Sequence, residues 1–164
     1  MVEEPNFKPI AALILFAGFY FGRATVGVAA LVGTMLIIDL VLGFYEPSMM
    51  LAVYASLAVC CGLGLLCRKS LQGRNVSAKA FGYFAISSLA MSCVFLVATN
   101  FAVWASGLWY PSTFEGLTSC FVAAIPFFRN TLASDFMFSQ GLMAVYGLVV
   151  LAQSRRERSV PITV

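Results

Sequence analysis

Apolar residues form long blocks along this chain, and polar residues gather between the blocks. Five blocks predict helices that cross a membrane: 9–22, 24–43, 49–67, 78–105 and 129–153. A hydrocarbon core of about 30 Å is crossed by about 20 apolar residues in a helix. The pattern therefore predicts an all-α integral membrane fold with five transmembrane helices.

A sixth apolar stretch, 114–125, is too short to cross the core in the same way. Ser112 fits the N-cap of a capping box with Glu115 three residues later, so a helix is predicted to begin there. Pro126 is expected to end or kink that helix after about three turns. The stretch is therefore predicted to be a re-entrant segment or half-helix, covered by the other helices.

Composition agrees with a membrane location. Hydrophobic residues make up 61% of the chain and charged residues 10%, and mean hydropathy is +0.93, whereas soluble domains carry about 25% charged residues. The length leaves no room for a separate soluble domain. We expect one transmembrane domain over 1–154, embedded in the lipid bilayer, and a polar cytoplasmic tail over 155–164.

The basic residues predict an orientation. With five spans and an external N-terminus, eight basic residues face the cytoplasm and two face outward; the eight are Arg23, Arg68, Lys69, Arg74, Lys79, Arg155, Arg156 and Arg158, and the two are Lys8 and Arg129. A sixth crossing would remove this asymmetry. The positive-inside rule thus favours an external N-terminus and a cytoplasmic C-terminus.

Small residues suggest close helix packing. Gly18 and Gly22 have the spacing that lets two helices approach closely, and we expect this face to pack within the protein rather than to dock a partner. Most of the five cysteines lie in apolar runs without C-x-x-C spacing, as expected for packing residues. Cys67, beside Arg68 and Lys69, could instead carry an acyl group.

Catalytic motifs are absent from the sequence. It contains no histidine and no G-x-S-x-G, H-E-x-x-H or P-loop pattern, so we expect neither an enzyme nor a bound metal or cofactor. If the protein takes part in uphill transport, a separate subunit must hydrolyse ATP. Nucleic-acid binding is not expected, because the topology already explains the basic residues.

Polar residues inside the predicted spans collect in the outer half of the bundle; they are Asp39, Asn100, Arg129, Asn130 and Asp135. A charge at the centre of a membrane helix costs about 2.5 to 3.5 kcal/mol on insertion scales, so the cluster needs a reason. Arg129 could pair with Asp39 or Asp135 and lock the helices together. Alternatively, the cluster could line a cavity open to the outside, with the aromatic residues of 101–110 as a lid. The sequence leaves both interpretations open.

The order of several short motifs carries a family resemblance. They are PNFKPI, the FG-R turn before a span that ends in Asp-Leu, TNFAVW and IPFFRNTLASD. Over most of residues 5–150 the chain resembles an uncharacterised bacterial membrane family related to the S components of energy-coupling factor (ECF) vitamin transporters. The resemblance implies a location in a bacterial inner (plasma) membrane. It also implies the fold of S components, a six-helix bundle that binds a vitamin or similar micronutrient near its outer face. Such a bundle topples when it docks on a shared transmembrane subunit that carries two ATPases.

One feature departs from that pattern. Relatives usually have a further hydrophobic helix before the PNF segment, whereas here only MVEE precedes it. We therefore expect the five spans to match helices two to six of an S component. We expect one of two explanations: the start codon was placed too late, or this member has lost the first helix and with it the coupling to ATPases.

These observations give two hypotheses. In the first, the protein binds a small molecule for uptake, and its substrate-binding residues are Asn6, Asp39, Asn100, Trp104, Tyr110, Arg129, Asn130 and Asp135. Arg129 would neutralise a carboxylate or phosphate of the ligand, amides would orient it and aromatic rings would stack on it. In the second, the chain is a non-transporting accessory or scaffold subunit of a larger membrane complex.

Overall fold

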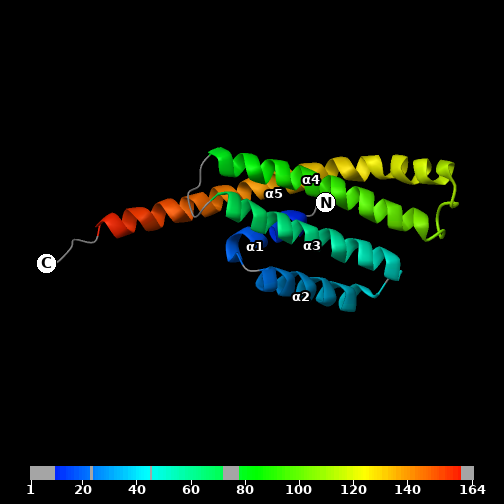
Figure 1. Cartoon of the computed structure of the whole chain (residues 1–164), viewed down its shortest axis with the longest axis horizontal. Coiled ribbons are helices and arrows are strands. Elements are labelled where there is room, and N and C mark those ends of the chain that lie inside the picture. The colour runs from blue at the N-terminus through cyan, green and yellow to red at the C-terminus, as the bar shows by residue number, and fades with distance from the viewer. Residues whose placement is uncertain (1–9, 23, 45, 72–77, 160–164) are drawn as a thin grey trace, which may run out of the picture.

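The computed structural model describes residues 10–22, 24–44, 46–71 and 78–159, and in these ranges all regular structure is helical. Figure 1 shows the helices packed side by side as an elongated bundle. In chain order they are α1 (Ile10–Phe21), α2 (Ala24–Leu42), α3 (Pro47–Ser70), α4 (Ala78–Ala105) and α5 (Phe114–Ser159). The prediction of an all-α fold is confirmed for this part of the chain.

Three of the described helices, α3, α4 and α5, are long and apolar enough to span a membrane. The described α1 has 12 residues, or about 18 Å at 1.5 Å per residue, which is less than a hydrocarbon core of about 30 Å. The described α2 has 19 residues, or about 29 Å at the same rise per residue. The sequence-based pattern of five spans thus corresponds to five helices, and within the described residues three of them have spanning length and apolarity.

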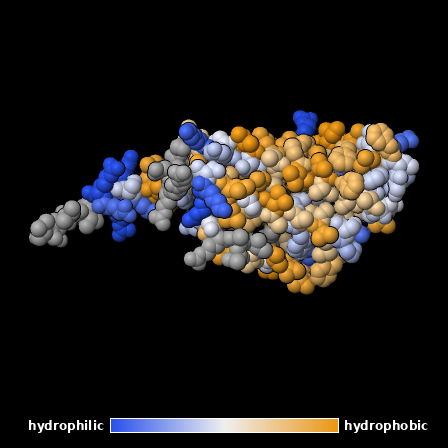
Figure 2. All heavy atoms as spheres, in the orientation of Figure 1, coloured by the Kyte–Doolittle hydropathy of each residue, from blue (hydrophilic) through white to orange (hydrophobic). Residues whose placement is uncertain are grey.

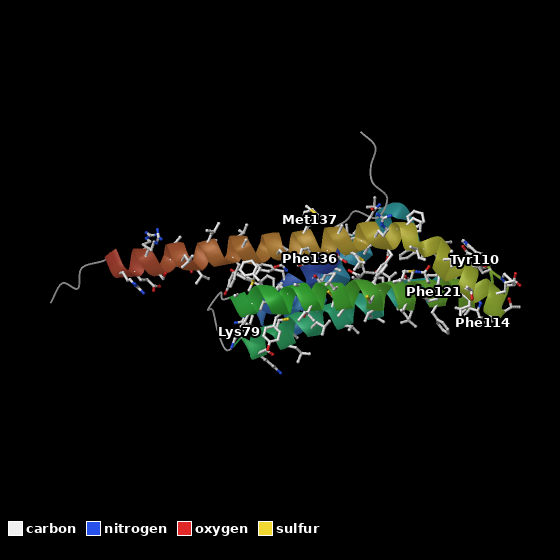
Figure 3. The ribbon with its side chains drawn as sticks, turned by 90° about the horizontal axis from the view of Figure 1, so that it is seen from above. Lys79, Tyr110, Phe114, Phe121, Phe136 and Met137 are labelled. Atoms are coloured by element: carbon white, nitrogen blue, oxygen red, sulfur yellow. The ribbon has the colours of Figure 1, made fainter. Side chains whose placement is uncertain are left out.

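Of the two outcomes predicted at Pro126, an end or a kink of the helix, the end is wrong, and so is a separate half-helix over 114–125. Residues 114–125 and the predicted span 129–153 belong to one helix, α5, which is 46 residues long and contains Pro126. Proline removes one backbone hydrogen bond and crowds the carbonyl four residues earlier. The helix continues because the turns on either side keep their own hydrogen bonds and α5 packs along α4. Figure 3 shows the response as a bend in the N-terminal, yellow part of α5.

The start of α5 lies where the sequence placed it, but the cap is shifted by one residue. The Gly116 backbone N–H donates to Thr113 Oγ1 over 3.1 Å. Thr113 is therefore the N-cap rather than Ser112. With Thr113 as N-cap, Gly116 rather than Glu115 occupies the N3 position, so the predicted capping box of Ser112 and Glu115 does not match this cap.

Two glycines bring α1 and α3 into backbone contact. A Cβ atom at Gly18 would meet the carbonyl group of Cys61, and one at Gly64 would meet the Leu15 carbonyl oxygen and the Phe19 nitrogen. Such close approach requires the absence of side chains. Gly22 lies against the Arg68 side chain rather than against a helix backbone.

The turn into α3 is fixed by Glu46. This N-cap accepts the Met49 backbone N–H over 3.0 Å and also accepts the Ser48 hydroxyl, while Pro47 occupies the first helical turn. These hydrogen bonds, with Ser48 first, hold the pKa of the Glu46 carboxyl below its ordinary value. The cap is therefore fully formed above the usual glutamate pKa and weakens only as the pH falls through the lowered value.

The apolar core lies where α1, α3, α4 and α5 meet; its buried residues are Leu15, Phe19, Cys60, Cys67, Ala80, Phe84, Met91 and Met143. Phe19 packs edge-on against both Phe84 and Tyr146, with ring centroids 5.1 and 5.4 Å apart. Cys67 is buried, and its sulfur lies 3.2 Å from Ser87 Oγ. This contact supports the packing interpretation of Cys67 over acylation.

Candidate ligand-binding cleft

A cleft of about 320 Å³ lies between α4 and the first half of α5. Its lining residues are Ser92, Phe95, Leu96, Thr99, Asn100, Val103, Tyr110, Cys120, Ala123, Ala124, Phe127, Phe128 and Thr131. In Figure 3, Tyr110 lies at the turn between the two helices and Phe121 lies on the α5 side. The volume is at the lower end of the range of small-molecule sites, so a ligand held here must be small.

Each wall of the cleft is one helical face. The α4 wall repeats at the spacing of three and four residues from Ser92 to Val103, and the α5 wall does so from Cys120 to Thr131. Ala123 and Ala124 are the small residues of the α5 wall, and their short side chains leave space that larger ones would fill. The cleft thus forms where the alanines of α5 face the polar residues of α4.

The polar lining consists of neutral groups. Asn100 Nδ2 donates to the Leu96 carbonyl oxygen of its own helix over 2.9 Å, and Thr99 Oγ1 donates to the Phe95 carbonyl oxygen over 2.7 Å. Asn100 Oδ1 also accepts the Cys120 thiol over 3.8 Å. An amide oxygen and a hydroxyl oxygen each have two lone pairs, so Asn100 and Thr99 keep acceptor capacity for a ligand. None of the described lining residues carries a charge. The chemistry suits an uncharged ligand with hydrogen-bond donors and an apolar or aromatic part.

Trp104 has a structural role in the loop after α4. Its indole Nε1 donates to the carbonyl oxygens of Pro111 and Thr113, over 3.2 and 3.1 Å. These bonds hold the 106–113 loop against the end of α4. Trp104 does not line the cleft, whereas Tyr110 in the same loop does.

A smaller hollow of about 160 Å³ adjoins the cleft and reaches Asp135. Phe95 and Thr131 line both spaces. Asp135 is 2% exposed, and its Oδ2 accepts the Ser92 hydroxyl over 2.8 Å. The Ala12 backbone N–H also hydrogen-bonds to this carboxylate.

The contact with Ala12 gives Asp135 a role at the start of α1. Ala12 is the third residue of the described part of α1. The carboxylate of α5 thus accepts a backbone N–H of α1 in the interior of the bundle. Asp135 therefore fixes α1 to α5 in the interior of the bundle.

Asp39 makes a separate contact at the other side of the bundle. It is 5% exposed, and its Oδ2 accepts the Tyr54 hydroxyl over 2.6 Å. This bond joins the end of α2 to α3. Asp39 does not line the α4–α5 cleft.

Replacing Tyr54 with phenylalanine is expected to lower the free energy of unfolding by about 1.5 to 3 kcal/mol, because it removes a hydrogen bond to a buried carboxyl group. The measurement is SDS-induced unfolding of the protein in mild detergent. Tyr83→Phe is the control, because Tyr83 is a partly exposed tyrosine on α4. Equal stability of the two variants would contradict the proposed strength of the Asp39–Tyr54 bond.

The remaining predicted site residues lie elsewhere. Arg129 is exposed on α5 and outside both spaces. Asn130 is half-buried on α5 and also outside the two linings, while Asn6 lies outside the described residues. Both buried carboxylates have hydroxyl partners, so Arg129 is not the partner of Asp39 or Asp135 in these hydrogen bonds.

The structure brings two of the eight predicted residues, Asn100 and Tyr110, into one cleft and places Asp135 beside it. Sequence reasoning missed the lining hydroxyls Thr99 and Thr131. It gave weight to charged residues and amides, whereas most of the lining residues are apolar or carry a hydroxyl. The spacing of the lining residues, every three and four positions on α4 and α5, was the available signal in the sequence.

The fold and its cleft define a class: an all-helical protein with three helices of membrane-spanning length and a small, uncharged cleft between two of them. Residues 1–159 match the model of a family of unknown function (DUF6580). The chain belongs to that family. No curated protein and no solved structure matches the chain.

Proposed function

We propose that this protein is an integral membrane protein that binds a small, uncharged, partly aromatic molecule in the α4–α5 cleft and takes part in its uptake. The observation that carries the proposal is the cleft itself, where Asn100, Thr99 and Tyr110 meet aromatic rings and small residues. The resemblance to S components of ECF transporters supports a vitamin-like or micronutrient-like ligand. A separate transmembrane and ATPase module would then supply the energy.

The charge distribution supports the orientation within this proposal. Arg68 and Lys69 end α3, Lys79 begins α4, and Arg155 and Arg156 lie near the end of α5. These helix ends lie toward the same end of the bundle (Figure 1). By the positive-inside rule that end faces the cytoplasm of a bacterial inner membrane, which places the cleft nearer the outside.

The placement of Arg129 changes the expected ligand. The sequence suggested that this guanidinium neutralises a carboxylate or phosphate, but the residue is exposed and outside the cleft. Arg129→Ala is therefore expected to leave ligand binding unchanged. An anionic ligand has no charged partner among the described lining residues.

Filling the cleft tests the proposal. Ala124→Phe puts a ring into the space between α4 and α5, and Asn100→Leu removes a neutral hydrogen-bonding group. Each is expected to lower the amount of co-purified small molecule about tenfold, as expected for the loss of about 1.4 kcal/mol of binding energy. The measurement is affinity purification of the protein in mild detergent, followed by mass spectrometry of small molecules.

Val122→Phe is the matched control, because Val122 is 58% exposed on the same helix and outside the cleft. It should retain the molecule and should unfold like the unmodified protein. Retention of the molecule by Ala124→Phe and Asn100→Leu as well would rule out this cleft as its site.

A second candidate function is that of an accessory or scaffold subunit in a larger membrane complex. One observation favours it: Asp39 and Asp135 are closed by hydrogen bonds within the bundle, as expected for groups that stabilise a fold rather than bind a ligand. The same purification distinguishes the two functions. A stoichiometric set of non-ATPase membrane proteins without a small molecule would favour the second.

A further inference from the structure

A larger hollow, of about 580 Å³, lies at the opposite end of the bundle from the α4–α5 turn. It is formed by the end of α1, the end of α3 and the second half of α5; the lining residues are Phe16, Phe19, Tyr20, Phe21, Arg68, Leu142, Val145, Tyr146, Val149, Val150 and Gln153. It shares no residue with the α4–α5 cleft. A ligand held here would therefore bind independently of one in the cleft.

The lining of this hollow has two chemical parts. Aliphatic side chains of α5, such as Val145 and Val149, form a wall along the helix, and aromatic rings of α1 face them. Arg68 is the one charged residue among the described lining residues. Such a surface fits a molecule with an apolar chain and an anionic group.

Arg68 keeps hydrogen-bonding capacity for an anion. Its Nη1 donates to the Phe19 carbonyl oxygen over 2.9 Å and also to the Tyr20 carbonyl oxygen, which caps the C-terminal end of α1. A guanidinium has five N–H donors, and those on Nη2 and Nε are not used in these two bonds. A phosphate can accept two of them side by side.

Gly22 allows the guanidinium to lie in this position. Its φ is +63°, a conformation that residues with side chains rarely adopt, and a Cβ atom there would meet the Arg68 guanidinium. Glycine at position 22 therefore leaves room for the Arg68 side chain at the C-terminal end of α1.

The surroundings are also basic. Lys69 follows Arg68 on α3, and Arg155 and Arg156 lie on α5 beyond Gln153. The end of α5 projects beyond the other helices and is hydrophilic, whereas the middle of the bundle surface is mainly apolar (Figure 2). A border between an apolar surface and basic residues is where the phosphate groups of a bilayer leaflet lie.

We propose that this hollow is a binding site for an anionic phospholipid, whose phosphate contacts Arg68 and whose acyl chain lies along the α5 wall of Leu142, Val145 and Val149. The choice of a lipid follows from charge complementarity at one end of the site and apolar lining along the rest. The proposal rests on the membrane location proposed above, and it does not depend on the ligand of the α4–α5 cleft.

The test compares two lipid probes on the full chain in mild detergent. Native mass spectrometry measures the affinity for phosphatidylglycerol and for phosphatidylcholine with the same acyl chains. Phosphatidylglycerol is expected to bind more tightly. Val149→Trp, which fills the hollow and leaves Arg68 in place, and Arg68→Gln are each expected to weaken phosphatidylglycerol binding about tenfold.

Matched variants separate the site from general effects. Leu148→Trp places the same ring on an exposed neighbouring residue, and Lys69→Gln removes the same charge one residue away; neither residue lines the hollow. Leu148→Trp should bind phosphatidylglycerol like the unmodified protein. Lys69→Gln should weaken binding less than Arg68→Gln, because Lys69 contributes only to the basic surroundings of the hollow. Because Arg68 also caps α1, Val149→Trp decides the outcome if Arg68→Gln unfolds.

Two results would overturn the proposal. One is equal binding of the two lipids, and the other is unchanged phosphatidylglycerol binding by Val149→Trp. A third arm uses inorganic phosphate: if phosphate alone displaces phosphatidylglycerol at equal concentration, the site recognises a free anion and the lipid assignment fails. Ala124→Phe changes only the α4–α5 cleft and should leave lipid binding unchanged. The lipid proposal and the proposed function can therefore fail independently of each other.

Discussion

Replacing Gly64 with alanine is expected to separate α1 from α3 and to destabilise the bundle by about 3 kcal/mol or more, at the upper end of the cost of overpacking. A methyl group at Gly64 would meet the Leu15 carbonyl oxygen, the Phe19 nitrogen and the Gly18 Cα. These are backbone atoms, so no side chain can rotate away to make room. The whole of α1 must shift instead.

Gly62→Ala gives a matched control on the same helix. Nothing lies within 4 Å of a Cβ atom at Gly62, and alanine is the better helix former by up to about 1 kcal/mol. This variant should be as stable as the unmodified protein or slightly more stable. Both are measured by SDS-induced unfolding in mild detergent, and equal loss in both variants would refute the close contact.

Replacing Asp135 with alanine is expected to lower the free energy of unfolding by about 1 to 3 kcal/mol, the cost of a buried donor that loses its acceptor. The substitution leaves the Ala12 backbone N–H without this acceptor, whereas the Ser92 hydroxyl keeps its bond of 3.1 Å to the Ser88 carbonyl oxygen. Asp135→Asn should cost less, because its amide oxygen still accepts. The measurement is the same unfolding titration.

A double-mutant cycle separates this contact from a general loss of packing. Ser92→Ala combined with Asp135→Ala should be less destabilising than the sum of the two single changes, by about 0.5 to 3 kcal/mol. Ser88→Ala is the control, because Ser88 is a buried serine one turn away whose hydroxyl donates to the Ala85 carbonyl oxygen of its own helix. Additive effects of Ser92→Ala and Asp135→Ala would show that the two residues do not interact.

Together, the contacts of Asp135 and Arg68 explain how α1 is held within the bundle. Asp135 of α5 accepts the Ala12 backbone N–H of α1, and Arg68 of α3 donates to the last carbonyls of the same helix. Arg68 thus lies at the negative, C-terminal end of the α1 dipole. In an apolar environment, backbone groups without a partner are costly, so both contacts stabilise the position of α1.

The predicted charged cluster failed for a physical reason. Depth along a helix can be estimated from the sequence, and it placed Asp39, Arg129 and Asp135 in the same half of the bundle. Depth says nothing about the direction in which each side chain points around its helix. Asp39 turns toward Tyr54 and Asp135 toward Ser92, while Arg129 points away from the interior.

The sequence alone determined the helical fold, the apolar blocks that form α3, α4 and α5, and the basic residues at the ends of those helices. These features depend on neighbouring residues and on helical spacing, which are local. The tertiary structure decided that α5 continues through Pro126, that Asp135 and Arg68 bind neighbouring helices, and where the two hollows lie. The contacts of these two side chains join residues more than 40 positions apart, as in Ser92–Asp135 and Arg68–Phe19, with separations of 43 and 49. Only the packing of the helices sets which of their faces meet.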